Sequence, residues 1–288
     1  MLARLPGPVR TAGRIVRQTL DDFLEDGGPR LSAAIAYYLL IAMAPLLILA
    51  VAAASVLFER AEVREFILAA GQRFLGGGAV EAIDEVLLGV MRSRAGGGTT
   101  ALSVAVALFG ASAAFSQLQS AINIAWGIRP RPEGFRDFLR RRLLAFLLIL
   151  VIGVLLLLVS ILFGAGFSEA LMAIMPAFTG MAWLTEKAIS TAGATILFAI
   201  VFTILPDRRV DWRDTLVGAL ATAVLFNAGS IALGAYLSQS SIGSIYGAAG
   251  SFAVLLVWLY YSTQVFLLGA EFTHVWAEHR RAARMARA

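Results

Sequence analysis

Two long stretches of this 288-residue chain contain no charged residue, and they restrict its fold more than any other feature. The first is the 28-residue stretch Leu31–Phe58, and the second is the 56-residue stretch Thr215–Ala270. Because a helix needs roughly 20 apolar residues to cross a bilayer core, the first stretch can supply one span and the second can supply two. Buried helices of soluble proteins rarely need such length. The pattern therefore predicts an all-α, polytopic membrane protein.

The composition agrees with that prediction and excludes several kinds of site. Hydrophobic residues make up 59% of the chain and charged residues 15%, where a soluble domain carries about a quarter. The chain has no cysteine, which excludes disulfides, thiolate nucleophiles and cysteine-ligated metals. The net charge is +5, and all basic residues except Lys187 are arginines. We interpret these arginines as determinants of membrane orientation, so we expect no nucleic-acid partner.

Six segments fit the pattern of transmembrane helices, and we divide the chain accordingly. Residues 1–30 form an amino-terminal segment without a signal-peptide-like apolar run, and residues 274–288 form a basic tail. Between them, 31–273 form a membrane domain. Its predicted spans are 31–58, 99–125, 143–167, 188–206, 215–237 and 249–273.

The distribution of basic residues predicts how these spans are oriented. If both termini share one side, 18 of the 24 Lys and Arg residues fall on that side and six on the other. Basic residues are retained in the cytoplasm, so we expect both termini to be cytoplasmic.

Two segments between spans have distinct patterns. In the first outer loop, 59–94, apolar residues recur at helical spacing on both sides of Gly76–Gly78, which predicts two short amphipathic helices joined by a glycine hinge. The segment 170–185 is apolar but too short for a span. We interpret it as an interfacial or re-entrant piece.

Polar residues inside the predicted spans are the candidates for contact with a substrate. In the second span they recur every three or four residues, and the fifth span and the loop after it add two more. These candidates are Ser116, Gln117, Ser120, Asn123, Asn227 and Tyr246. Transport predicts that they line one polar cavity, whereas helix packing explains the same residues by hydrogen bonds between helices.

Three further features are candidates for a mechanism. Glu271 ends a long uncharged helix, where it could couple to protons or pair with an arginine of the 129–142 loop. Pro45 lies within the first span, where it could act as a hinge or simply kink the helix. A group of arginines beside the third span could bind anionic lipid headgroups as well as orient the chain. This group is Arg136, Arg140, Arg141 and Arg142.

Four segments taken in order resemble the YihY/BrkB family of bacterial inner-membrane proteins. They are Ala33–Tyr38 with Ala44–Leu47, Gln119–Trp126 with Phe138–Leu143, Leu205–Asp214, and Ile245–Gly250 with Trp258–Tyr261 and Gly269–Thr273. The resemblance covers roughly residues 15–280. It implies a six-span membrane protein without established catalytic chemistry, linked to the envelope or to lipid export. It also carries an older label, ribonuclease BN, that is regarded as a misassignment.

The residues themselves disfavour the ribonuclease label. A metal-dependent nuclease needs clustered histidines and carboxylates, but the two histidines, His274 and His279, are spaced to point apart on a helix. No nucleotide-binding or nucleophile motif is present, so we expect neither an enzyme nor a cofactor nor a metal site.

These observations predict two functions of different classes. The first is movement of a lipid, an envelope precursor or a small solute across or out of the inner membrane, with membrane lipids as partners. The alternative is a non-catalytic scaffold that binds envelope-assembly proteins through its outer 59–94 helices.

Overall fold

The computed structural model describes residues 7–55, 59–74, 77–92, 109, 113–128, 182–208, 210–239 and 250–285, and the ordered elements among them are helices. No strand occurs within these ranges, which confirms the predicted all-α class. The helices are α1 (Gly7–Glu25), α2 (Gly28–Ala54), α3 (Arg60–Phe74), α4 (Gly77–Arg92), a helix over 113–125, α8 (Ala182–Ile204), α9 (Trp212–Gln239) and α11 (Gly250–Met285).

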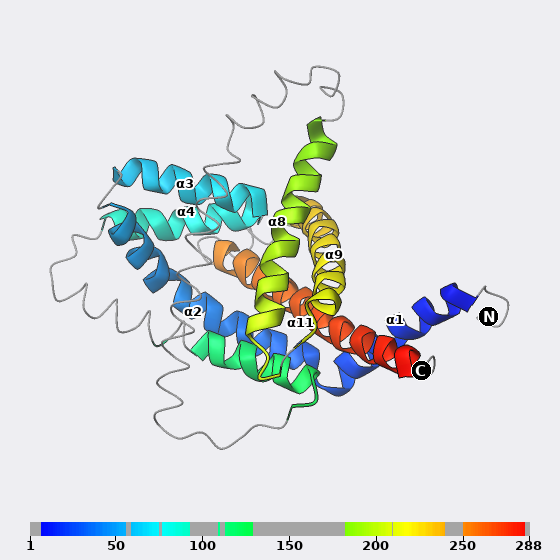
Figure 1. The fold of residues 1–288 in the computed structure, drawn as a ribbon. Helices are drawn as coiled ribbons and strands as arrows, with labels where there is room; N and C mark the ends of the chain where they lie inside the picture. Colours follow the sequence, from blue (N-terminus) through cyan, green and yellow to red (C-terminus); the bar gives the residue numbers. More distant parts are fainter. Residues whose placement is uncertain are drawn as a thin grey trace.

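The long helix α11 is the centre of the fold. It packs against α1, α2, α4 and α9, and it runs diagonally through the molecule (Figure 1). Its contact with α2 is antiparallel: Thr263 of α11 donates a hydrogen bond to the carbonyl of Ser32 at 3.0 Å, and further along the pair Leu255 packs against Ala36. The chain therefore crosses the molecule in α2 and returns in α11.

Small residues allow α9 to approach α11 closely. A Cβ atom built on Gly269 would lie 1.9 Å from Thr222 Oγ1, and one built on Gly229 would lie 1.9 Å from the Tyr261 hydroxyl. Glycine at these positions lets the two backbones pack together, as is common between membrane helices. The Tyr261 hydroxyl also donates to the carbonyls of Leu225 and Phe226, at 3.1 and 3.2 Å.

A single aromatic-rich core joins most of the described helices. Phe23 of α1, Ile35 of α2, Ile122 of the 113–125 helix, Phe202 of α8 and Phe266 of α11 all belong to it. The rings of Phe202 and Phe266 lie 5.2 Å apart between centroids. Burial of these large side chains fixes how the helices are rotated about their own axes.

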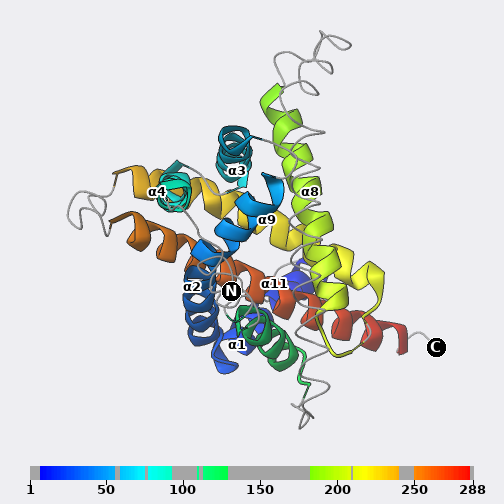
Figure 2. The same cartoon turned by 90° about the vertical axis from the view of Figure 1, so that its left-hand side faces the viewer.

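The helices α3 and α4 occupy the two positions predicted for amphipathic helices in the first outer loop. They pack side by side, and Arg64 of α3 binds Asp84 of α4 through two hydrogen bonds of 2.7 and 2.6 Å. Figure 2, which views this side of the molecule, shows α3 and α4 in front. They lie at the opposite end of the molecule from the two chain termini (Figure 1).

Several predicted spans coincide with helices, while the full set of six is only partly covered. The helices α2, α8, α9 and α11 lie on four of the predicted spans, and residues 109 and 113–125 are the described parts of a fifth. In the described chain, Trp212–Tyr236 and Phe252–Met285 are long and apolar enough to cross a membrane, and Gly28–Met43 and Thr191–Ile204 are shorter apolar stretches. The predicted span 143–167 lies outside the described residues.

The structure changes three of the predicted boundaries. Residues 7–25 form α1, for which we predicted no helix, and α11 continues to Met285, well into the segment we assigned to the tail. The last four residues of the predicted 170–185 piece belong to α8, which begins at Ala182. In α1 apolar residues recur at helical spacing between charged residues. In α8 and α11 the helix continues through charged residues, at which our predicted boundaries stopped.

Candidate functional site

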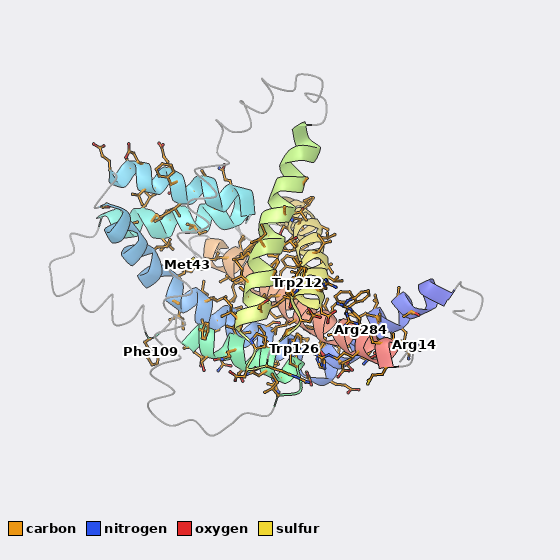
Figure 3. The ribbon with its side chains drawn as sticks, in the orientation of Figure 1. Arg14, Met43, Phe109, Trp126, Trp212 and Arg284 are labelled. Carbon is orange, nitrogen blue, oxygen red and sulfur yellow. The ribbon has the colours of Figure 1, made fainter. Side chains whose placement is uncertain are left out.

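Two candidate residues, Glu271 and Asn123, lie at the end of the molecule where α1 and α11 meet the turn after α8. Arg14 of α1 and Arg284 of α11 are at this end, and Trp126 lies just after the helix over 113–125 (Figure 3). The turn between α8 and α9 also reaches this end, since Asp207 contacts Asn123 there. Four separate parts of the chain therefore meet where the sequence predicts the cytoplasmic side.

Glu271 lies inside the contact between α11 and its neighbours. Only 3% of its surface is exposed, although it is charged at neutral pH in water. The charged groups that act on it most strongly are Asp26 in the turn after α1, Asp22 of α1 and Glu278 of α11, and all three are acidic. Among the residues that the structure describes, none gives this carboxylate a hydrogen bond or an ion pair. The predicted alternative partner, an arginine of 129–142, lies outside that part of the chain.

One turn further along α11, His274 faces the same group of elements. Its ring lies 5.2 Å from that of Trp126, and its Nε2 lies 3.3 Å from a carboxylate oxygen of Glu278. The indole N–H of Trp126 is buried, and no hydrogen-bond partner for it occurs in the described chain. His279 instead contacts the carbonyl of Val275 at 3.0 Å. The two histidines thus have different partners, as their spacing predicts.

The acidic surroundings also affect Asp26, in the turn between α1 and α2. Burial raises the pKa of the Asp26 carboxyl above its ordinary value, and the negative charges of Asp22 and Glu25 raise it further, while His274 acts in the opposite direction. Gly27 makes this turn possible because it adopts a φ of 71°, which residues with a side chain rarely adopt.

Asn123, a predicted cavity residue, holds the turn after α8. Its amide donates to a carboxylate oxygen of Asp207 at 2.8 Å, and its side-chain oxygen accepts from the Asp207 backbone N–H at 3.1 Å. Gln119, one turn earlier, donates to the other Asp207 oxygen at 3.3 Å. These contacts are structural and lie at an exposed position, which fits the packing interpretation of the amide.

Asn227 makes a different contact at a different level of the molecule. Its amide donates to the Thr191 hydroxyl of α8 at 3.3 Å and to the carbonyl of Ala223 at 3.0 Å. Thr191 precedes the end of α8, Ile204, by 13 residues, or about 20 Å of helix. Since Asn123 is attached beyond that end, the structure does not bring these two candidates together.

The remaining predicted residues are distributed as follows. Ser116 and Ser120 are exposed, and Gln117 is half-buried on the same helix. Pro45 lies within α2, whose helix continues through it to Ala54. Five candidates lie outside the described residues: Tyr246, Arg136, Arg140, Arg141 and Arg142.

Sequence reasoning missed a buried ion pair at this same end. Asp214, in the first turn of α9, binds Arg280 of α11, and Asp214 is almost fully buried. A carboxylate in the first turn of a helix is a usual signal for stabilisation of that terminus, but nothing in the sequence pointed to an arginine 66 residues away. In the part of the chain that the structure describes, no three His, Asp or Glu side chains are grouped so as to hold a metal ion.

Comparison with known proteins gives relatives over almost the whole chain. A membrane protein of Rhodospirillum centenum, designated UPF0761, is 29% identical over 97% of this chain and 61% of its own length. A UPF0761 membrane protein of Azotobacter vinelandii is 31% identical over 88% of this chain and 61% of its own. The UPF0761 membrane protein YihY of Salmonella newport is 39% identical over 30% of each chain.

The chain spans about three fifths of the length of the first and the second of these relatives. No solved structure matches it. The family described as "Virulence factor BrkB" matches residues 19–288, which confirms the resemblance derived from the motifs. The chain is a membrane protein that belongs to the BrkB virulence-factor family.

Proposed function

We propose that this protein spans the bacterial inner membrane several times, with both termini in the cytoplasm. Three observations support the proposal. The relatives are named as membrane proteins. The start of α2 and the end of α11 lie at one end of an antiparallel pair (Figure 1). The arginine distribution favours a cytoplasmic position for that end.

Within that framework, we propose that the protein moves a lipid, an envelope precursor or a small solute across or out of the membrane, and that Glu271 couples this movement to protons. The observation that carries the proposal is the burial of Glu271 in α11, the helix around which the fold is built. Burial of an ionisable residue in a membrane helix costs free energy, and such residues commonly belong to an ion or substrate pathway.

The surroundings of Glu271 favour a carboxyl group that gains and loses a proton during transport. Burial of a carboxylate is costly unless hydrogen bonds or an opposite charge compensate it. The negative charges of Asp26, Asp22 and Glu278 act on Glu271 and repel a further negative charge there. A proton or a cationic substrate group would relieve that repulsion. The buried Trp126 indole, which has no hydrogen-bond partner in the described chain, packs against His274, and His274 follows Glu271 by three residues on one face of α11.

The test uses purified full-length protein reconstituted in liposomes that contain a fluorescent phospholipid and a pH-sensitive dye. We expect wild-type protein to accelerate lipid exchange between leaflets or proton entry, and we expect Glu271→Gln to abolish the proton-dependent part. Glu271→Asp, which keeps the charge, should retain it partly. Rates for wild-type protein equal to those of protein-free liposomes, in both assays, would contradict the proposal.

A scaffold function is the second candidate, because α3 and α4 form an ion-paired unit away from the buried carboxylate. Phe66 of α3 is partly exposed on this unit. A scaffold predicts that substitutions on the surface of α3 and α4 impair the envelope in cells, while Glu271→Gln does not. If Glu271→Gln impairs the envelope and the substitutions on α3 and α4 do not, the result would favour transport.

A further inference from the structure

The amino-terminal helix α1 has two apolar faces, and only one of them is covered by the protein. Ile15 and Phe23 point into the core, with 4% and 9% of their surfaces exposed. The neighbouring residues Val16, Leu20 and Leu24 are 53%, 46% and 63% exposed. Because they are spaced by four residues, they form one stripe along the helix. About half of the surface of these three large residues therefore remains uncovered.

The location of this stripe indicates what covers it. The helix α1 ends at Glu25, and the turn at Gly27 leads directly into α2, whose uncharged stretch starts at Leu31. If α2 crosses the membrane, α1 ends at the membrane surface, and it packs beside the carboxyl-terminal part of α11 (Figure 1). Exposed apolar residues of α9, such as Leu220 and Val224, lie in a predicted span where contact with lipid is expected. The stripe on α1 lies outside every predicted span.

The charges beside the stripe fit a membrane surface. Arg14 and Arg17 are exposed and lie on the polar face of α1 in its first half. Exposed acidic residues, Asp21 and Glu25, lie on the polar face in the second half, and Arg17 contacts Asp21 at 3.5 Å. That exposed pair is weak, so it leaves the arginine free to turn toward lipid phosphates. Apolar residues on one face and arginines on the other are typical of helices that lie in the interface.

We propose that α1 lies in the plane of the membrane surface from which α2 starts, with Val16, Leu20 and Leu24 among the acyl chains and Arg14 and Arg17 at anionic headgroups. The proposal requires that α2 crosses the membrane, but it does not depend on transport or on Glu271. It assigns a lipid-binding surface to a segment that the sequence pattern alone identified only as a cytoplasmic amino-terminal segment.

The absence of cysteine from the chain makes the test direct, because a single introduced cysteine can carry a nitroxide label without background. Leu20→Cys reports on the stripe, and Gln18→Cys, on the opposite face of α1, is the matched control. Val16→Cys serves as a second reporter should the first variant be poorly produced. Each labelled full-length protein is placed in nanodiscs of phosphatidylcholine, with and without phosphatidylglycerol, and relaxation by oxygen and by a water-soluble nickel chelate is compared.

We expect oxygen to relax the label at position 20 more strongly than the nickel chelate does, and we expect the reverse at position 18. We also expect the label at position 20 to move deeper when phosphatidylglycerol is present. Dominance of the nickel chelate at both positions would overturn the proposal, because the stripe would then face water. Protection of position 20 from both reagents would also overturn it, because protein would then cover the stripe. An equal depth in the two lipid mixtures would overturn the headgroup contact of the arginines.

Discussion

Gly218 of α9 lies directly against Thr273 of α11: a Cβ atom built on Gly218 would fall 1.8 Å from Thr273 Oγ1 and 2.7 Å from its Cβ. The relationship is reciprocal, since Gly269 of α11 lies against Thr222 of α9 in the same way. Each threonine also donates a hydrogen bond to the glycine four residues before it, at 2.6 and 2.7 Å. Two Gly-x-x-x-Thr motifs therefore interlock where the antiparallel helices cross.

The first prediction concerns this crossing. Gly218→Ala places a methyl group on a β-branched side chain whose hydroxyl is hydrogen-bonded, so the helices must separate. We expect the free energy of unfolding to fall by about 1–3 kcal/mol, which is the usual range for overpacking a close contact. The measurement is the midpoint of thermal unfolding of the purified protein in detergent. Gly269→Ala should behave in the same way.

Gly234, also in α9, is the matched control, because a Cβ atom there would meet nothing within 4 Å. Alanine is the better helix former by about 1 kcal/mol, so Gly234→Ala should leave the midpoint unchanged or raise it. If Gly218→Ala and Gly234→Ala lower the unfolding midpoint equally, the close approach of α9 to α11 is not the reason for glycine at position 218.

The second prediction concerns Asn123 and Asp207. In Asn123→Asp two carboxylates face each other in place of an amide and a carboxylate, and one hydrogen-bond donor is lost. We expect this variant to be less stable than Asn123→Ala, and we expect the double variant Asn123→Asp with Asp207→Asn to recover most of the loss. Thermal unfolding of the four proteins at neutral pH measures the effect. Failure of the double variant to recover would exclude charge repulsion as the cause.

The third prediction concerns the outer helices. Arg64 and Asp84 form a bidentate contact that lysine cannot reproduce. We therefore expect Arg64→Lys to weaken the packing of α3 on α4 nearly as much as Arg64→Ala. Limited proteolysis of protein in sealed vesicles would detect this as faster cleavage in 59–94. We expect Arg64→Ala with Asp84→Ala to be no worse than either single variant. Additive effects would mean that the two residues act separately.

The fourth prediction concerns Asp26 and pH. Because its pKa is raised in the folded protein, the folded state disfavours the ionised carboxyl. The ionised form therefore lowers stability as the pH rises above the ordinary value of about 3.9, and the penalty is complete above the raised value. We expect Asp26→Asn to unfold at a higher temperature than wild type near neutral pH, and the difference to shrink as the pH falls toward 4. A difference independent of pH would contradict this cause.

The sequence predicted elements better than it predicted contacts. The apolar stretches located α2, α9 and most of α11, and the helical spacing around Gly76–Gly78 located α3 and α4. The helix α1 was missed because its apolar residues are interrupted by arginines and acids, so no uncharged run marks it. Its spacing of apolar residues was the available signal.

Polar residues show the limit of sequence reasoning most clearly. Asn123 and Asn227 look alike as amides in apolar helices, yet one holds Asp207 and the other holds Thr191. Helical spacing shows which residues share a face, but it does not show which helix that face meets. Rotation and register between helices depend on the packing of large side chains such as Phe202 and Phe266.

The sequence alone determined that this is an all-helical membrane protein of the BrkB family, because the length of an apolar stretch and the order of motifs are properties of the linear chain. Only the tertiary structure decided that Glu271 is buried among acids, that Gly218 meets Thr273 and that Asp214 meets Arg280. The physical reason is that bilayer insertion depends on the summed hydrophobicity of some 20 consecutive residues. A hydrogen bond between distant segments instead requires that folding bring two atoms within about 3 Å of each other.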